Sequence, residues 1–179
     1  MARARVHPTF SYHALTVPVF RRGLGNLRGM LVTAESHCEK AGINEAELLA
    51  TRLAPDMFPL VRQVQMAGGM ATYVTTTLAN RPPFSLPDTE TCLGELQLRL
   101  DRIDDYLAQM REAEIGDRTS ERYTLPPLGG TSVTLPAERF VTEFALPNFY
   151  FHLNMSYALL RTAGVPLGKS DYIGELTSE

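Results

Sequence analysis

The sequence lacks most of the features that assign a function directly. Its 179 residues include only two cysteines, Cys38 and Cys92, which lie far apart and outside any Cys-x-x-Cys or metal-knuckle spacing. We expect reduced thiols in a cytoplasmic protein, with no disulfide between them. No apolar run approaches the roughly 20 residues that span a bilayer, and no segment has the pattern of a secretory signal. The sequence therefore predicts no membrane partner.

The sequence also lacks a large excess of charged side chains of one sign. Seventeen basic side chains stand against 20 acidic ones, for a formal net charge of −3. Such a balance produces no field that attracts a phosphate backbone, so no nucleic-acid partner is expected. Internal repeats and low-complexity linkers are absent as well. We predict a short N-terminal extension, residues 1–13, followed by a single domain, residues 14–179.

Motifs for phosphate or acyl chemistry are missing too. The Gly68-Gly69 pair lies within a helical pattern and does not form a phosphate-binding loop, and no Gly-x-Ser-x-Gly elbow occurs. The segment from Pro59 to Asn80 contains no His, Asp, Glu or Cys. A transition metal needs several such ligands at compatible positions, so we expect neither a metal nor another cofactor.

What the sequence does contain is apolar residues spaced by alternating fours and threes, the pattern of a helix packed in a bundle. One such segment ends at Gly42. A second begins at Pro59 and ends near Asn80, and a third has Asp88 as its expected N-cap and Gly116 beyond its end. The apolar positions of the three segments are Phe20, Leu24, Leu27, Leu31, Ala34 and Cys38; Leu60, Val64, Ala67, Ala71, Val74 and Leu78; and Leu93, Leu96, Leu100, Ile103, Leu107 and Met110.

The last third of the chain differs in pattern. Short β-type runs around Gly129-Gly130, within Tyr123 to Leu135, predict a small hairpin or structured loop. A final helix is expected from near Pro136 to Gly164, apolar nearly all round and kinked or broken at Pro147. These patterns predict an all-α, antiparallel four-helix bundle with a small hairpin before its last helix.

Polar residues in that final helix are the first candidates for a site, since buried polar groups need partners or a wet cavity. Asn148, His152 and Ser156 share one helical face. A second face carries Tyr150, Asn154, Tyr157 and Arg161. These side chains either fix the packing of the helix through satisfied hydrogen bonds or line a pocket. Asp56 likewise either caps a turn whose Met57 and Phe58 close the bundle end, or lies at the mouth of that pocket.

Four stretches resemble one known family: Leu53 to Leu60, Gln63-Val64-Gln65, Phe144 to His152, and Gly164 to Lys169 with Asp171-Tyr172. They are similar to the family catalogued as DUF1993, which is placed in the DinB/YfiT-like superfamily. The resemblance implies a four-helix bundle and a homodimer. Several superfamily members are metal-dependent thiol transferases or isomerases that use one His from the second helix and a His-x-x-x-His pair on the fourth. Only His152 matches that pattern here, because Ser156 replaces the second His of the pair.

Two functional hypotheses follow. The first is a DinB-like protein that binds a small molecule, or a metal-independent enzyme, with its pocket between the second and fourth bundle helices around His152. His152 would exchange protons, since its ordinary pKa is about 6.5. The alternative is a non-catalytic, homodimerising bundle whose polar core residues only fix packing. For the first hypothesis the candidate catalytic residues are His152, Asp56 and Tyr157, and the candidate ligand-binding residues are Gln63, Asn148, Tyr150 and Arg161.

Overall fold

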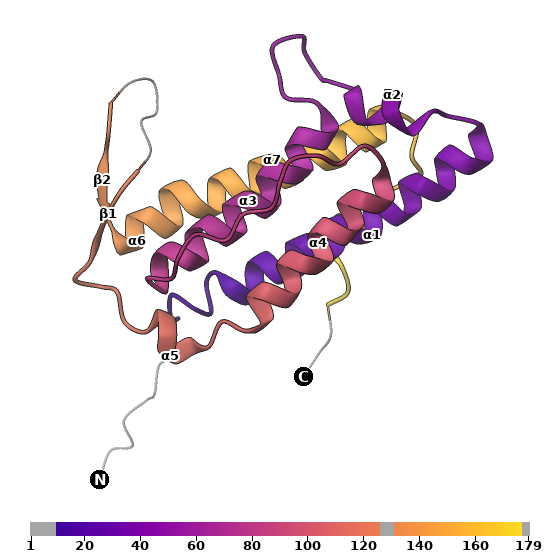
Figure 1. The fold of residues 1–179 in the computed structure, drawn as a ribbon. Coiled ribbons are helices and arrows are strands. Elements are labelled where there is room, and N and C mark those ends of the chain that lie inside the picture. Colours follow the sequence, from indigo (N-terminus) through magenta and orange to yellow (C-terminus); the bar gives the residue numbers. More distant parts are fainter. Residues whose placement is uncertain (1–9, 126–130, 177–179) are drawn as a thin grey trace.

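The computed structural model describes residues 10–125 and 131–176 of the chain. Four long helices form a bundle in which α1 (Val17–Ala41) packs most closely on α4 (Leu93–Ala108), and α3 (Leu60–Leu78) on α7 (Leu146–Thr162) (Figure 1). The predicted all-α bundle is therefore confirmed. None of the described helices is long and apolar enough to span a membrane.

The helix boundaries follow local chemistry. Gly42 ends α1 in the left-handed conformation, at φ 67°, and its N–H donates to the Cys38 carbonyl. Pro59 precedes α3, which ends at Leu78 shortly before Pro82 and Pro83. The predicted N-cap of the third bundle helix is wrong: α4 begins at Leu93 after Cys92, and Asp88 lies in the preceding linker as an acceptor for two arginines.

Smaller elements connect the long helices. A hairpin pairs β1 (Arg122–Thr124) with β2 (Thr134–Pro136) in antiparallel register, which confirms the predicted hairpin, although Gly129-Gly130 lies outside the described residues. Short helices α2 (Glu45–Ala50), α5 (Glu112–Ile115), α6 (Ala137–Arg139) and α8 (Lys169–Ile173) were not predicted. They are too short to carry a helical apolar period.

The expected break at Pro147 takes a specific form. Residues Phe140–Ala145 form a π-helical turn, η1, that continues directly into α7, and the N–H of Leu146 donates to the carbonyl of Val141. Proline has no N–H and its ring crowds the carbonyl four residues before it, which a wider turn relieves. The helix therefore changes type at Pro147 and runs on to Thr162.

Helix direction depends on the linker from residue 79 to residue 92. Each closely packed pair, α1 with α4 and α3 with α7, is antiparallel (Figure 1). The linker returns along α3, however, so that α4 starts at the same end as α3 and runs parallel to it. The contacts agree with this direction, because Arg62 and Arg99 meet at Asp88 while Arg81 at the other end of α3 pairs with Glu114.

The core lies between the four helices and is apolar apart from a few polar side chains. Phe20 of α1 and Phe149 of α7 pack with ring centroids 4.8 Å apart. Cys38 is buried and Cys92 half-buried, and both are free thiols. Before α1, the ring Nε2 of His13 donates to the carbonyl of Met110 at 3.0 Å, so residues that the sequence assigned to an extension contact the bundle.

Candidate functional site

His152 of α7 and Gln63 of α3 form the buried polar pair of the bundle. The Nδ1 of His152 lies 2.8 Å from the Oε1 of Gln63, and the two side chains are 6% and 1% exposed. The structure thus brings together two of the residues that the sequence proposed for the site. Their elements meet because α3 and α7 are one of the two closely packed helix pairs of the bundle.

The hydrogen bonds of Gln63 fix the tautomer of His152. The Nε2 of Gln63 donates to the carbonyl of Phe58 at 3.3 Å, which leaves Oε1 facing the histidine. A flipped amide would set two acceptors against each other at Phe58. Because Oε1 only accepts, Nδ1 of His152 carries the proton. Its Nε2 then holds the lone pair and hydrogen-bonds to no other described residue.

The surroundings keep His152 neutral. Burial lowers the pKa of His152 below its ordinary value, and the nearby positive charge of Arg62 lowers it further. A neutral imidazole with a fixed Nδ1–H is a proton or hydrogen-bond acceptor at Nε2. That is the chemistry this pair offers.

The other polar groups on this face bind their own helix. The Ser156 hydroxyl donates to the His152 carbonyl at 2.9 Å, and the Asn148 amide donates to the Phe144 carbonyl at 2.7 Å. Among the described residues there is no group of three or more His, Cys, Asp or Glu side chains that would hold a metal ion. The donors around His152 are therefore a neutral amide and a hydroxyl, which replace metal-bound waters poorly.

The remaining proposed site residues are spread over the molecule. Asp56 is exposed in the turn before α3, where Phe58 is 48% exposed and Met57 half-buried. Tyr150 is 39% exposed, and Tyr157 packs against Tyr172 with centroids 5.8 Å apart. Arg161 donates to the Val165 carbonyl at 2.9 Å. In the described structure Asp56, Asn148, Tyr150, Tyr157 and Arg161 make no hydrogen bond to His152 or Gln63.

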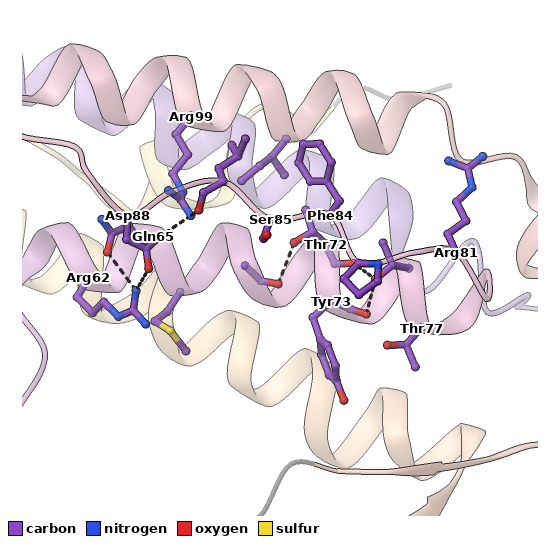
Figure 2. Close-up of a pocket in the computed structure, with 16 residues that line it drawn as sticks. Arg62, Gln65, Thr72, Tyr73, Thr77, Arg81, Phe84, Ser85, Asp88 and Arg99 are labelled. Carbon is purple, nitrogen blue, oxygen red and sulfur yellow. Dashed lines mark hydrogen bonds and ion pairs between the residues drawn. The ribbon is translucent and has the colours of Figure 1, made fainter.

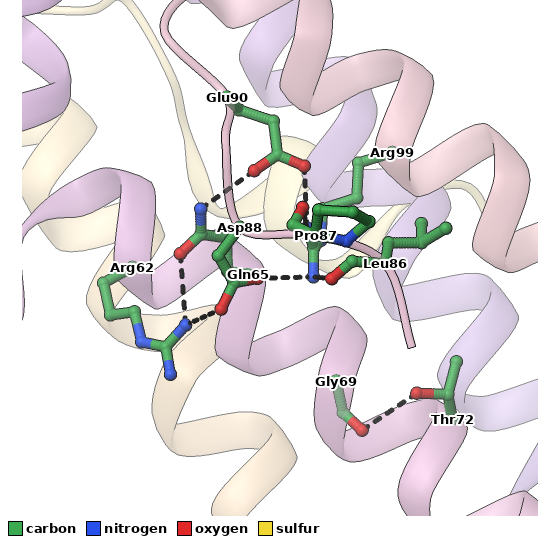
Figure 3. Close-up of polar contacts among 9 residues, drawn as sticks. All are labelled: Arg62, Gln65, Gly69, Thr72, Leu86, Pro87, Asp88, Glu90 and Arg99. Carbon is green, nitrogen blue, oxygen red and sulfur yellow. Dashed lines mark hydrogen bonds and ion pairs between the residues drawn. The ribbon is translucent and has the colours of Figure 1, made fainter. Parts of the chain in front are cut away.

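On another side of α3, an ionic network holds the returning linker to the bundle (Figure 3). Arg99 of α4 donates to Asp88 at 2.9 Å and to Glu90 at 2.7 Å, while Arg62 donates to Asp88 and Gln65 to Glu90. Arg99 also donates to the carbonyls of Pro87, at 2.9 Å, and Leu86. One buried guanidinium therefore binds four residues of the linker.

The network has the electrostatics of a buried ion pair. Arg99 and Glu90 are 6% and 10% exposed at their side chains. Burial by itself raises the pKa of Glu90, but the hydrogen bonds from Arg99 and Gln65 outweigh it and hold that pKa below its ordinary value. Because a charge buried without a partner is costly, the linker and α4 depend on each other.

Between α3, the linker and α4 lies a groove with a cavity volume of about 380 Å³ (Figure 2). At one end Arg62 and Arg99 reach Asp88, and at the other stands Arg81. The stacked rings of Phe84 and Tyr106, with centroids 4.1 Å apart, hold the linker against α4 beside it. The groove is lined by Arg62, Gln65, Met66, Gly69, Thr72, Tyr73, Thr76, Thr77, Arg81, Pro83, Phe84, Ser85, Leu86, Asp88, Arg99 and Ile103.

Sequence reasoning did not identify these groove residues as a site. One signal was available, because Arg62 is the single charged residue of α3 and Asp88 and Glu90 are the acidic residues of the linker. An isolated charge in an otherwise neutral helix needs an acceptor. Because 26 residues separate Arg62 from Asp88, local sequence patterns could not identify Asp88 as its acceptor.

The comparisons with known proteins agree with this architecture. The family model described as "Domain of unknown function (DUF1993)" matches residues 12–173. The chain belongs to the DUF1993 family. It is also similar to the crystal structure of a DinB family member from Shewanella denitrificans, with a TM-score of 0.86 and 34% identity over 93% of this chain and 94% of that one. No curated protein matches the chain.

The metal chemistry implied by the DinB-like superfamily does not fit this member. The amide of Gln63 occupies Nδ1 of the His152 ring, and Ser156, one turn after His152, donates its hydroxyl to the His152 backbone carbonyl. We therefore derive no metal-dependent step for this DUF1993 protein.

Proposed function

We propose that this DinB-like protein binds a small organic molecule in the groove between α3, the linker and α4, and does so without a metal. The observation that supports ligand binding most directly is the groove itself. Its volume of about 380 Å³ is within the range of small-molecule sites. Like such sites, it combines an apolar lining with a few convergent polar groups.

The lining offers both kinds of contact. Met66, Tyr73, Phe84 and Ile103 supply apolar surface. The Thr72 hydroxyl donates to the Gly69 carbonyl at 3.0 Å, as does that of Thr76 to the Thr72 carbonyl at 2.8 Å, so the oxygens retain free acceptor capacity toward a ligand. Such groups orient a bound molecule, while the apolar surface supplies most of the affinity.

His152 is proposed as the proton acceptor of the same region. It does not line the groove, but Arg62 does, and the charge of Arg62 acts on His152. Asp56 and Tyr157 remain proposals as catalytic partners, as do Asn148, Tyr150 and Arg161 as ligand contacts.

Gly69 allows a direct test. It lines the groove, and a Cβ at this position meets nothing within 4 Å, so Gly69→Leu fills the groove without a backbone clash. Gly25 of α1 is a matched control, since it also has open space around a Cβ and does not line the groove. Small molecules that raise the melting temperature of the wild type should do so with Gly25→Leu and not with Gly69→Leu.

Each outcome of that screen is informative. Ligand stabilisation at a concentration of 100 times the Kd amounts to about 2.7 kcal/mol, which a melting curve resolves. If the same molecules stabilise Gly69→Leu as well as the wild type, the groove is not the binding site. If a bound molecule is also turned over, the proposed role of His152 predicts that His152→Gln lowers turnover, and unchanged turnover would contradict that role.

A further inference from the structure

Arg62 is the most exposed arginine of the groove and still has hydrogen-bonding capacity to offer. Its Nη1 donates to Asp88 and, at 3.3 Å, to Gln65, while Nε and Nη2 bond to no other described residue. The side chain is 37% exposed. A guanidinium with two adjacent free N–H groups matches the geometry of a carboxylate.

The other two arginines of the groove are less exposed. Arg99 uses both terminal nitrogens on the linker, and its Nε is shut off from solvent. Arg81 donates through Nη2 to Glu114, and its side chain is 28% exposed. Asp88, Glu90 and Glu114 pair with these arginines and balance their charge, so the preference for a negatively charged ligand rests on the free N–H groups of Arg62.

The shape of the groove limits the rest of the ligand. Its lining extends along α3 from Arg62 to Thr77, which is about 22 Å at the helical rise per residue. From the Arg62 end, Met66, Gly69 and Tyr73 follow one another on the same helical face, with Ile103 and Phe84 opposite. The groove is therefore elongated along α3.

We propose that the groove takes an organic carboxylate with an unbranched or flat apolar body. The carboxylate binds the free Nε and Nη2 of Arg62, and the body lies along Met66 and Gly69 toward Tyr73. This inference rests on the proposed binding function and names the chemical class of its ligand. A neutral ligand would leave the free donors of Arg62 without a charged acceptor.

The test compares octanoate and decanoate with their neutral amides, by titration calorimetry on the full chain. We expect the acids to bind more tightly than the amides, and their affinity to fall as salt is added. Arg62→Gln should weaken the acids about tenfold or more, to the level of the amides, since it removes a charge-assisted pair of hydrogen bonds. Arg62→Lys keeps the positive charge but lacks the two adjacent N–H donors of the guanidinium. Its affinity for the acids should therefore lie between that of the wild type and that of Arg62→Gln.

Arg122→Gln is the matched control. It removes the same charge from the exposed β1 strand, outside the groove, and should leave all affinities unchanged. A second readout is the NMR titration of His152. Because the charge of Arg62 holds the pKa of His152 down, a carboxylate bound at Arg62 should raise that pKa, and a bound amide should not.

The outcomes separate the two proposals. Equal affinity for acids and amides, or acid binding that is unaffected by Arg62→Gln, overturns the carboxylate assignment. If binding is then still lost with Gly69→Leu, the groove remains a small-molecule site. If no molecule shows binding that depends on Gly69, both proposals are wrong.

Discussion

Gly68 of α3 lies directly against Ile103 of α4: a Cβ atom on Gly68 would stand 2.5 Å from the Cδ1 of that isoleucine. The next residue, Gly69, has open space at the same position. The two adjacent glycines therefore have different structural roles. The first allows α3 and α4 to approach each other, and the second leaves the groove open.

This difference predicts opposite effects of alanine. Gly69→Ala should stabilise the fold by about 0.5 to 1 kcal/mol, because glycine is disfavoured within a helix. Gly68→Ala should be less stable than Gly69→Ala by about 1 to 2 kcal/mol, since Ile103 must move to admit the methyl group. Urea denaturation of the two variants measures the gap, and equal stabilities would contradict the packing.

Acid should destabilise the protein through His152. The pKa of His152 is lowered in the folded state, so between that pKa and the unfolded value of about 6.5 the unfolded chain binds more protons. Stability must therefore fall as the pH falls through this window. His152→Gln has no such proton to bind and should lose less stability between about pH 7 and about pH 5. Identical pH profiles would show that His152 does not titrate as described.

Removing Arg99 should release the linker. Arg99→Met leaves Glu90 buried without its ion-pair partner and should cost about 3 kcal/mol of unfolding free energy. Arg102→Met, three residues further along α4 and exposed, should stay within about 0.5 kcal/mol of the wild type. Chemical denaturation compares the two, and a cost for Arg99→Met no larger than for Arg102→Met would refute the role of the network.

Metal content gives a further check. The protein, purified without an affinity tag, should carry no stoichiometric zinc, nickel or iron at His152, since Gln63 and Ser156 donate too weakly to complete a site. Elemental analysis measures this. About one metal per chain that is released by His152→Ala would make a metal-dependent reaction the preferred function.

Homodimerisation remains a prediction from the superfamily resemblance. Phe151 of α7 is 49% exposed and Val32 of α1 is 42% exposed, so both the first and the last bundle helix present apolar surface. We expect sedimentation to give a dimer at micromolar concentration, and Phe151→Asp to weaken it. A monomer at high micromolar concentration would count against the dimer.

Part of the candidate site was predictable and part was not. Burial of polar groups in an apolar helix singled out His152, and Gln63 was proposed with it; the two are hydrogen-bonded across 89 residues of sequence. Asp88, in contrast, was assigned to a helix cap because cap preferences are local. Its true partners, Arg62 and Arg99, come from two different helices.

The sequence alone determined the four long helices, their buried faces and the hairpin, because apolar spacing, Gly42 and the β-type runs act within a few residues of each other. Only the tertiary structure decided the course of the linker from residue 79 to residue 92. That course makes α3 and α4 parallel and brings three arginines to one groove. Local propensity cannot set it, because an irregular, proline-rich segment is positioned by long-range ion pairs and stacking, which no short sequence pattern encodes.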